Sequence, residues 1–479
     1  MIDILLLTIP VHELRPYIVG ISSVHTYLNN NNISCLTRDP VTEYYELIEK
    51  NYNNDLAKDL ERSLQSPHSS QLLEGFTEYL KNIVITEKPK FIGLSALVSN
   101  RDASVAVAKI LKKIFPEIEI ILGGPIAKFL KESFHKLTSI DFLYTGEAES
   151  GFANFFNADL RYNLLGLSYR NKNNEVIHNN QALPADLLNL PIAYHDKLFK
   201  TKFHTENYKP YFPVVFSRGC PYHCTFCEGW KVLDGFRYFP IDKVMEFVRS
   251  YENDERYMLV EDSIINGNDK WLKAFCNAMI ENNIKLTWGG MFRFHPMMEQ
   301  EGYLDLLGRS GLKRLNFGLE SGSPKILKNL GKFANMEKMF GIFNRLREVK
   351  SKYNIRISVM LMLGSPYEEE VDFQKTLKFL YFNRDVIDMI DACSAFVLND
   401  DLTILHQLEK ENLVVRKSSI NWATPSSSPK IRIDRMKRME KFCKQINLPV
   451  RLVYAGLDDI NQNDWVSWPI NSEVTSLAL

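Results

Sequence analysis

Short, uninterrupted apolar runs recur along the chain, and segments with helical periodicity separate them. In the first 160 residues these runs cover residues 4–9, 91–97, 118–122 and 140–144. A helix is predicted between the second and third runs, because Ala103, Val107 and Leu111 share one face. Strands that are apolar on both faces are typical of a parallel sheet covered by helices on both sides. The sequence therefore predicts an α/β protein whose first domain, residues 1–160, is a doubly wound parallel sheet.

Polar and glycine residues follow these runs and mark where a ligand of the sheet would lie. Ligands of doubly wound sheets bind at the carboxyl ends of the strands. Glycines at such ends let a bulky ligand approach the backbone closely. The candidate binding residues at these ends are Thr8, Pro10, Ser95, Leu97, Val98, Ser99, Gly123, Gly124, Gly146 and Glu147.

The strand–helix alternation resumes over residues 206–400. Apolar strands are expected at residues 214–216, 257–260, 285–292, 315–319, 355–363 and 387–398. Six β/α units predict a partial (β/α)6 barrel, and parallel barrels carry their chemistry at the carboxyl ends of the strands. Residues 161–205 are predicted to be a docked linker with a hairpin at 171–180, and residues 401–479 a small, mostly helical C-terminal region.

Three cysteines with C-x₃-C-x₂-C spacing follow the first barrel strand: Cys220, Cys224 and Cys227. Three thiolates can bind three irons of a [4Fe–4S] cluster and leave the fourth iron open to a small molecule. Zinc is the alternative metal, but it usually takes four N or S ligands, and the chain has no second C-x₂-C pair. The other cysteines are isolated, so neither a second cluster nor a disulfide framework is expected.

With Phe226 directly before its third cysteine, the triplet resembles the signature of the radical S-adenosylmethionine (SAM) enzymes. In that family the open iron chelates SAM, and the reduced cluster cleaves it to a 5′-deoxyadenosyl radical. The resemblance implies SAM contacts from Phe226, Glu261, Asp262, Arg293, Glu320, Ser321 and Leu363. The charges suit the ligand, since a carboxylate would bind the SAM ammonium and a guanidinium its carboxylate. Alternatively, Glu320 forms a salt bridge with Arg314 or Lys325, and Glu261 and Asp262 are charges at a helix N-terminus.

The first 160 residues resemble the Rossmann-like cobalamin-binding domain that is fused to many radical SAM enzymes. The resemblance rests on three strand ends in order: an SAL-VSN end at residues 95–100, ILGGP at 121–125 and LYTGEAE at 143–149. It implies that cobalamin binds at the strand ends named above. The chain has no Asp-x-His-x-x-Gly motif, so cobalamin would bind without a histidine ligand from the protein. The alternative is a domain that has lost the cofactor and serves as a scaffold or substrate lid.

Together these resemblances imply a cobalamin-dependent radical SAM enzyme that methylates an unactivated carbon of a small-molecule or peptide substrate. One SAM would methylate cob(I)alamin, a second would be cleaved at the cluster, and the substrate radical would take the methyl group from methylcobalamin. An electron donor such as flavodoxin or ferredoxin would reduce the cluster. The alternative is the same architecture catalysing a non-methylating cyclisation, ring rearrangement or oxidation. A non-enzymatic sensor is disfavoured because it needs no SAM contacts, and a methylthiotransferase because only Cys35 lies in the N-terminal region.

Composition narrows the expected partners and location. The chain has 58 basic and 58 acidic residues, so its net charge is zero and a nucleic-acid partner is not expected. No apolar run is long enough for a membrane span, and residues 1–7 lack the basic and small-residue flanks of a signal peptide. A cytoplasmic location is expected, and an oxygen-sensitive cluster fits a reducing compartment.

Overall fold

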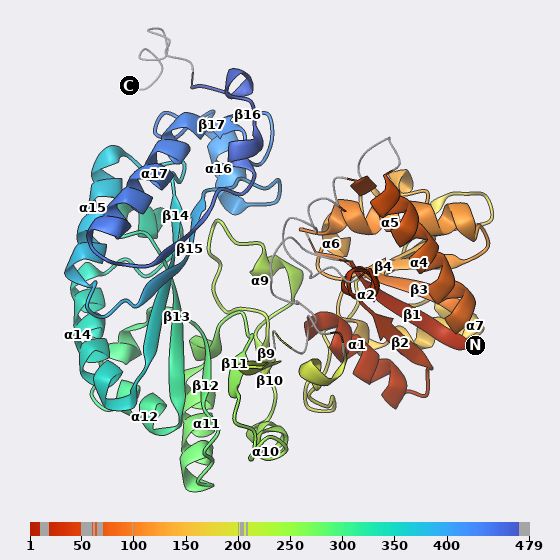
Figure 1. Cartoon of the computed structure of the whole chain (residues 1–479), viewed down its shortest axis with the longest axis horizontal. Coiled ribbons are helices and arrows are strands. Elements are labelled where there is room, and N and C mark those ends of the chain that lie inside the picture. The colour runs from red at the N-terminus through yellow and green to blue at the C-terminus, as the bar shows by residue number, and fades with distance from the viewer. Residues whose placement is uncertain are drawn as a thin grey trace. The chain divides into compact units, whose positions relative to one another are not determined.

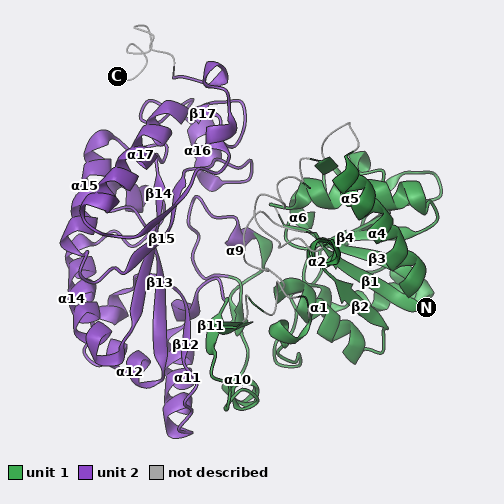
Figure 2. Ribbon diagram, viewed as in Figure 1, with its two compact units in different colours: residues 1–219, 232–261 green, residues 220–231, 262–479 purple. Residues whose placement is uncertain are grey.

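The computed structural model describes residues 1–9, 19–48, 60, 63–64, 70–97, 99–199, 201, 206 and 209–468 of the 479-residue chain. The chain divides into two compact units, coloured separately in Figure 2. Unit 1 contains residues 1–219 and 232–261, and unit 2 contains residues 220–231 and 262–479. The cysteine loop therefore belongs to unit 2, whereas the residues on either side of it belong to unit 1.

A seven-stranded sheet forms the centre of unit 1, with the strand order β2-β1-β3-β4-β5-β6-β7. The first five strands in this order are parallel, and β6 and β7 are added antiparallel at one edge. The apolar runs identified in the sequence coincide with β1, β3, β4 and β5, and the predicted α/β fold class is confirmed. The bounds are β1 (Ile2–Thr8), β2 (Cys35–Arg38), β3 (Pro89–Ser95), β4 (Glu119–Gly123), β5 (Phe142–Tyr144), β6 (Leu167–Arg170) and β7 (Val176–His178).

Side chains of β1 alternate between two hydrophobic cores, one on each face of this sheet. Ile4 and Leu6 pack with residues of α1, whereas Leu5 and Leu7 pack with residues of α4 and α5. This alternation follows from the two-residue period of a strand. Because both faces are covered, β1 is apolar at every position from Ile4 to Leu7. The helices of this part are α1 (Val19–Asn30), α2 (Pro40–Leu47), α4 (Gln71–Glu87), α5 (Arg101–Ile114), α6 (Ala127–Leu130) and α7 (Ala158–Arg161).

Residues 167–178 lie within the segment expected to be a linker, yet they form part of the sheet. They contribute the predicted hairpin as β6 and β7, with a turn closed by the bond from Asn171 N to Glu175 O. β6 pairs antiparallel with β5 and extends the parallel sheet. Strands of three and four residues carry too little pattern to be told from a loop in the sequence.

The remainder of unit 1 comes from the two chain segments that flank the cysteine loop. Here β8 and β11 pair in parallel, and β9 and β10 pair antiparallel. These elements are β8 (Tyr211–Val214), β9 (Ser217–Arg218), β10 (Arg237–Tyr238), α10 (Ile241–Arg249) and β11 (Tyr257–Val260).

Unit 2 is built on a parallel sheet with the strand order β18-β15-β14-β13-β12. In Figure 1, helices α14, α15 and α17 lie along one side of β13 to β15. The strands are β12 (Trp288–Phe292), β13 (Leu312–Glu320), β14 (Arg356–Leu363), β15 (Met389–Ala395) and β18 (Val450–Val453), with a small antiparallel pair β16 (Val415–Arg416) and β17 (Trp422–Ala423). The helices are α11 (Asp269–Glu281), α12 (Tyr303–Arg309), α13 (Pro324–Asn329), α14 (Met336–Tyr353), α15 (Glu370–Phe382), α16 (Thr403–Lys410) and α17 (Pro429–Gln445), and α9 (Gly229–Val232) follows the cysteine loop.

The C-terminal region is not purely helical. Helices α16 and α17 lie within the region predicted to be mostly helical, residues 401–479, but β18 joins the sheet beside β15. This strand has only four residues, Val450 to Val453, and an exposed Arg451 interrupts its apolar character. The apolar pattern of this segment is therefore too short to predict a strand.

Within the described ranges, every helix is either too short or too polar to cross a membrane.

Candidate functional site

The three cysteines lie on a loop between β9 and α9 that is tied to another part of unit 2. Thr225 donates a hydrogen bond from its backbone N to Leu330 O (3.2 Å) and one from its hydroxyl to Asn329 O (2.9 Å). Within the loop, Cys227 N donates to Cys224 O at 3.2 Å. These bonds fix the loop to the end of α13, so the position of the thiols is set by the fold of unit 2.

Arg293 lies against this loop, directly after β12. Its Nη1 is 3.0 Å from the sulfur of Cys224, and its Nη2 donates to Gly331 O at 2.7 Å. Its guanidinium carbon also lies 4.2 Å from the centre of the Tyr222 ring. Asn266 holds the backbone of Arg293 through two hydrogen bonds, at 3.0 Å and 2.8 Å. The sequence placed Arg293 at the site for a SAM carboxylate, and the structure places it on a cysteine of the loop.

The donors around the thiols fit a bound iron–sulfur cluster. Besides Arg293, Gly229 N donates to the sulfur of Cys227 at 3.3 Å, and N–H groups of this kind stabilise thiolate ligands. Burial raises the pKa of Cys220 and of Cys227, and the neighbouring thiols of the loop add to both shifts. A cationic metal centre would hold such thiols as thiolates.

Among the residues that the structure describes, no three Cys, His, Asp or Glu side chains converge as they would around one ion. In a four-iron cluster each thiolate binds a different iron, so the three sulfurs lie further apart than around one ion.

Glu320 ends β13 next to the cysteine loop and is paired with a lysine that the sequence did not indicate. Its Oε1 lies 2.9 Å from Nζ of Lys332, which also donates to Gly318 O at 3.1 Å. The same Nζ lies 5.6 Å from the centre of the Phe226 ring. The partners considered from the sequence bind other carboxylates: Arg314 pairs with Asp391, and Lys325 pairs with Glu369 and Asp372. Lys332 thus brings a positive charge between two predicted SAM contacts, Phe226 and Glu320.

The other predicted SAM contacts differ in how much of each side chain is available. Ser321 is fully buried, and its hydroxyl lies 3.1 Å from that of Thr376 on α15, so it faces a helix. Leu363 is the last residue of β14 and is also fully buried. Glu261 and Asp262 follow β11, and Asp262 is 2% exposed. The boundary between the units falls between these last two residues.

In unit 1, the predicted cobalamin residues gather at one edge of the sheet. Thr8 pairs with Ser95, and Ser95 pairs with Gly123, so the ends of β1, β3 and β4 are level. Gly124 follows with a φ of +93°, and a Cβ on it would lie 2.5 Å from Ala96 O, so this tight turn requires glycine. Leu97 N donates a hydrogen bond to Asn100 Oδ1 at 2.6 Å, and Ser99 is exposed. Pro10 and Val98 lie outside the described residues.

The carboxylate of Glu147 forms ion pairs with two arginines of unit 1. Arg218 Nη1 lies 2.6 Å from its Oε2, and Arg237 binds its Oε1. The second Nη of Arg218 binds Glu149 at 2.6 Å. The side chain of Glu147 is only 6% exposed, and the two carboxylates raise the pKa of Arg218 against the effect of its burial. The carboxylate predicted to contact cobalamin therefore connects the end of β5 to Arg218, two residues before Cys220.

A pocket lies beside Gly146 in the same unit. Its lining includes Lys128 of α6, Lys131 directly after this helix, and Gln181, none of which the sequence singled out. These residues add two cations and an amide to the edge of the sheet where the predicted cobalamin residues lie. Their types are common on surfaces, so no motif distinguishes them in the sequence.

Residues 214–380 match the family model described as the radical SAM superfamily. Among curated proteins, the chain is similar to an uncharacterized methyltransferase, PH0819, of Pyrococcus horikoshii, with 24% identity over 332 residues, 66% of this chain and 70% of the relative. It is also similar to the bacteriochlorophyllide d C-12(1)-methyltransferase of Chlorobaculum tepidum, with 28% identity over 185 residues. That match spans 38% of this chain and 40% of the relative's length.

Two solved structures have the same fold at low identity. The radical SAM methyltransferase TsrM of Kitasatospora setae, with cobalamin and a [4Fe–4S] cluster bound, matches with a TM-score of 0.66 and 13% identity, over 88% of this chain and 82% of TsrM. The cobalamin-dependent SAM radical enzyme OxsB, with aqua-cobalamin and SAM bound, matches with a TM-score of 0.60 and 16% identity, over 93% of this chain and 62% of OxsB. Residues 214–380 thus match a radical SAM domain, and the chain has the fold seen in TsrM and OxsB.

Proposed function

We propose that the chain is a cobalamin-dependent radical SAM enzyme that methylates an unactivated carbon of a small-molecule or peptide substrate. The observation that carries this proposal is the cysteine loop, in which Arg293 Nη1 and Gly229 N are directed at the sulfurs of Cys224 and Cys227. Such donors suit thiolates that bind a cluster. The similarity to two proteins named as methyltransferases and to TsrM favours methyl transfer as the reaction.

In this proposal Cys220, Cys224 and Cys227 hold the [4Fe–4S] cluster, and the strand ends of unit 2 hold SAM. When bound, the cluster supplies the electron that cleaves SAM, and cobalamin carries the methyl group. Lys332 pairs with one oxygen of Glu320 and so holds this carboxylate at the strand end where the ribose and methionine parts of SAM would bind. Because Lys332 also lies over Phe226, it fixes the carboxylate relative to the cysteine loop.

The cobalamin site of the proposal is the level edge formed by Thr8, Ser95 and Gly123. Gly124 makes a close turn against Ala96 at this edge, and Lys128 and Lys131 line the pocket beside Gly146. Glu147 acts as a support, since its carboxylate already binds Arg218 and Arg237. A flavodoxin-like or ferredoxin-like protein would supply the electron to the cluster.

The first test measures iron and corrinoid in protein purified and reconstituted without oxygen. The triple variant C220A/C224A/C227A is expected to lose nearly all bound iron, whereas C35A, which removes a cysteine of β2, is expected to retain it. After reconstitution with hydroxocobalamin and gel filtration, the visible spectrum is expected to show corrinoid bands in all three proteins. Iron content that is equal in the triple variant and wild type would overturn the cluster assignment.

The second test separates methylation from other radical reactions of the same fold. Incubation with SAM, a reductant and candidate substrates is expected to release both 5′-deoxyadenosine and S-adenosylhomocysteine. Release of 5′-deoxyadenosine alone, in cobalamin-loaded protein with a substrate that is consumed, would point to cyclisation, rearrangement or oxidation and would refute methyl transfer.

A further inference from the structure

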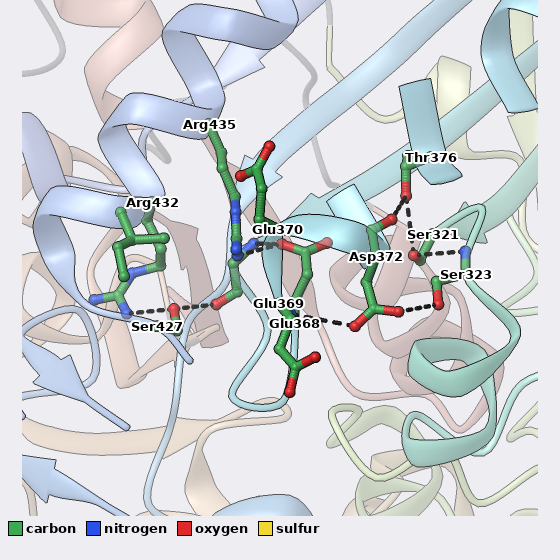
Figure 3. Close-up of polar contacts among 12 residues, drawn as sticks. Ser321, Ser323, Glu368, Glu369, Glu370, Asp372, Thr376, Ser427, Arg432 and Arg435 are labelled. Atoms are coloured by element: carbon green, nitrogen blue, oxygen red, sulfur yellow. Dashed lines mark hydrogen bonds and ion pairs between the residues drawn. The ribbon is translucent and has the colours of Figure 1, made fainter. Parts of the chain in front are cut away.

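Three polar side chains at the start of α15 are fully buried in unit 2. Glu368 lies just before the helix, and Asp372 and Thr376 lie on its first two turns; each is 0% exposed. Buried carboxylates and hydroxyls are stable only with hydrogen-bond partners. Figure 3 shows that these partners come from the turns after β13 and β14 and from α17.

The turn after β13 is bonded to the α15 side chains. Ser323 donates from its hydroxyl to Asp372 Oδ1 at 2.6 Å, and Gly322 N donates to Thr376 Oγ1 at 3.0 Å. A Cβ on Gly322 would lie 2.7 Å from the Cα of Thr376, so the turn touches the helix. Glu320, at the start of this turn, has a φ of +65°, which side-chain-bearing residues rarely adopt. The bonds to α15 therefore hold Glu320 in a strained backbone conformation, and this conformation fixes where its carboxylate lies.

The turn after β14 is held at Gly364. Its N donates to Glu368 Oε2 at 2.6 Å, and its O accepts from the hydroxyl of Ser427 at 2.7 Å. The φ of Gly364 is +71°, and a Cβ there would lie 2.3 Å from Cγ of Arg432. Gly364 directly follows Leu363, a predicted SAM contact, and side chains hold both its N–H and its carbonyl oxygen.

Glu368, which binds this turn, is paired with an arginine of α17. Arg435 Nη1 donates to Glu368 Oε2 at 2.8 Å, and their side chains are 4% and 0% exposed. Arg432, one turn earlier, stacks on Trp422 at 3.8 Å and donates to Ile420 O at 2.8 Å. Burial raises the pKa of Glu368, and Arg435 and the Gly364 N–H oppose that shift.

This arrangement is poorly explained by stability alone. Oε1 of Glu368 and Nε of both arginines are buried and have no hydrogen-bond partner within the described part of the chain. An apolar pair of similar size often stabilises a protein as well as a buried ion pair does. The same two helices also carry an exposed pair, Arg438 with Glu370, whose side chains are 38% and 54% exposed. The exposed pair provides a matched control for the buried one.

We infer that Arg435 and Glu368 are positioning residues for SAM: through Gly364 and α15 they set the conformation of the two strand ends that carry Leu363 and Glu320. This inference rests on the proposed function, in which those strand ends bind SAM. If the inference holds, helix α17 affects SAM affinity through its contact with Glu368, which binds the turn after β14, and not through direct contact with SAM.

The test compares wild type with E368L/R435M and with the surface control E370L/R438M, all as full-length, cluster-reconstituted protein. Three quantities are measured: the unfolding midpoint, the Kd for SAM by equilibrium dialysis, and deuterium exchange in a peptide that contains Gly364. In E368L/R435M the midpoint is expected to stay near that of wild type, because no unpaired charge remains. Exchange at Gly364 is expected to accelerate because its acceptor is gone, and the Kd for SAM to rise about tenfold. The surface control is expected to leave all three quantities unchanged.

A Kd within twofold of wild type in E368L/R435M would overturn the inference, as would unchanged exchange at Gly364. If E368L/R435M does not fold, S427A removes the other anchor of Gly364 with a smaller change in volume. It is expected to raise the Kd for SAM about threefold, and an unchanged Kd would overturn the inference. If wild type itself does not bind SAM, the proposed function is refuted at that step, whereas normal binding by wild type and both variants refutes only the positioning role.

Discussion

Replacement of Arg293 by methionine tests how much the guanidinium contributes to the stability of the cysteine loop. Methionine keeps much of the apolar stem but removes the bonds to Gly331 O at 2.7 Å and to the sulfur of Cys224 at 3.0 Å. In the cluster-free protein the thiol is a weak acceptor, so the main losses are the charged bond to Gly331 O and the contact with the Tyr222 ring. These losses amount to about 1.5–3 kcal/mol and about 0.5–1 kcal/mol, respectively. R293M is therefore expected to reduce the free energy of unfolding by about 2–4 kcal/mol.

In the cluster-loaded protein the same variant is expected to lower the reduction potential. A positive donor at a thiolate ligand stabilises the reduced, more negative cluster, so its removal makes reduction harder. If the bond differs by about 1 kcal/mol between the two oxidation states, the shift is about 40 mV to lower potential. The potential is measured by titration of the reduced cluster's electron paramagnetic resonance signal.

Arg309 provides the matched control for R293M. It pairs with Asp305 at 3.3 Å on α12, and its side chain is 55% exposed, so R309M is expected to cost less than about 1 kcal/mol. The potential in R309M is expected to equal that of wild type. If R293M and R309M have the same unfolding free energy and the same potential, Arg293 does not act on the cluster as the geometry indicates.

Two further predictions concern unit 1. G219A is expected to abolish folding or to lower the free energy of unfolding by more than about 3 kcal/mol, because its Cβ would lie 1.8 Å from Gly235 O and its φ is +82°. The control is G302A, with φ at +76° and no atom within 4 Å, which is expected to lower the free energy of unfolding in urea by only about 1–2 kcal/mol. Equal losses in the two variants would refute the close contact at Gly219. His195 is fully buried, and burial, with Arg218 nearby, lowers its pKa to about 3. Since the unfolded chain takes up this proton near its ordinary pKa, the stability that neutral His195 contributes is complete above about pH 6.5 and declines by up to about 1.4 kcal/mol per pH unit towards pH 3. The urea midpoint of H195N is accordingly expected to fall less steeply than that of wild type between pH 7 and pH 5, and parallel curves would contradict a neutral buried histidine.

The sequence indicates at which strand ends the candidate residues lie, but not which partners their side chains bind. The cysteine spacing and the polar ends of apolar strands indicate an edge of a sheet, because parallel strands end level with one another. The pairing of Glu147 with Arg218 and of Glu320 with Lys332 could not be predicted, since it depends on how loops cross that edge. The same holds for Ser321, whose hydroxyl turns towards α15 rather than towards the strand end. Strand β18 was missed because four residues carry no usable period.

The late position of strand β18 in the sequence affects how unit 2 folds during translation. It pairs with β15 through Val450 and Leu452, whereas β15 itself is complete at residue 395. During synthesis, the outer edge of β15 therefore stays unpaired while more than fifty further residues leave the ribosome (450 − 395 = 55). An open strand edge is a template for association with other chains. Unit 2 is thus exposed to misassembly until nearly the whole chain has been translated, and premature termination before residue 450 would leave this edge permanently open.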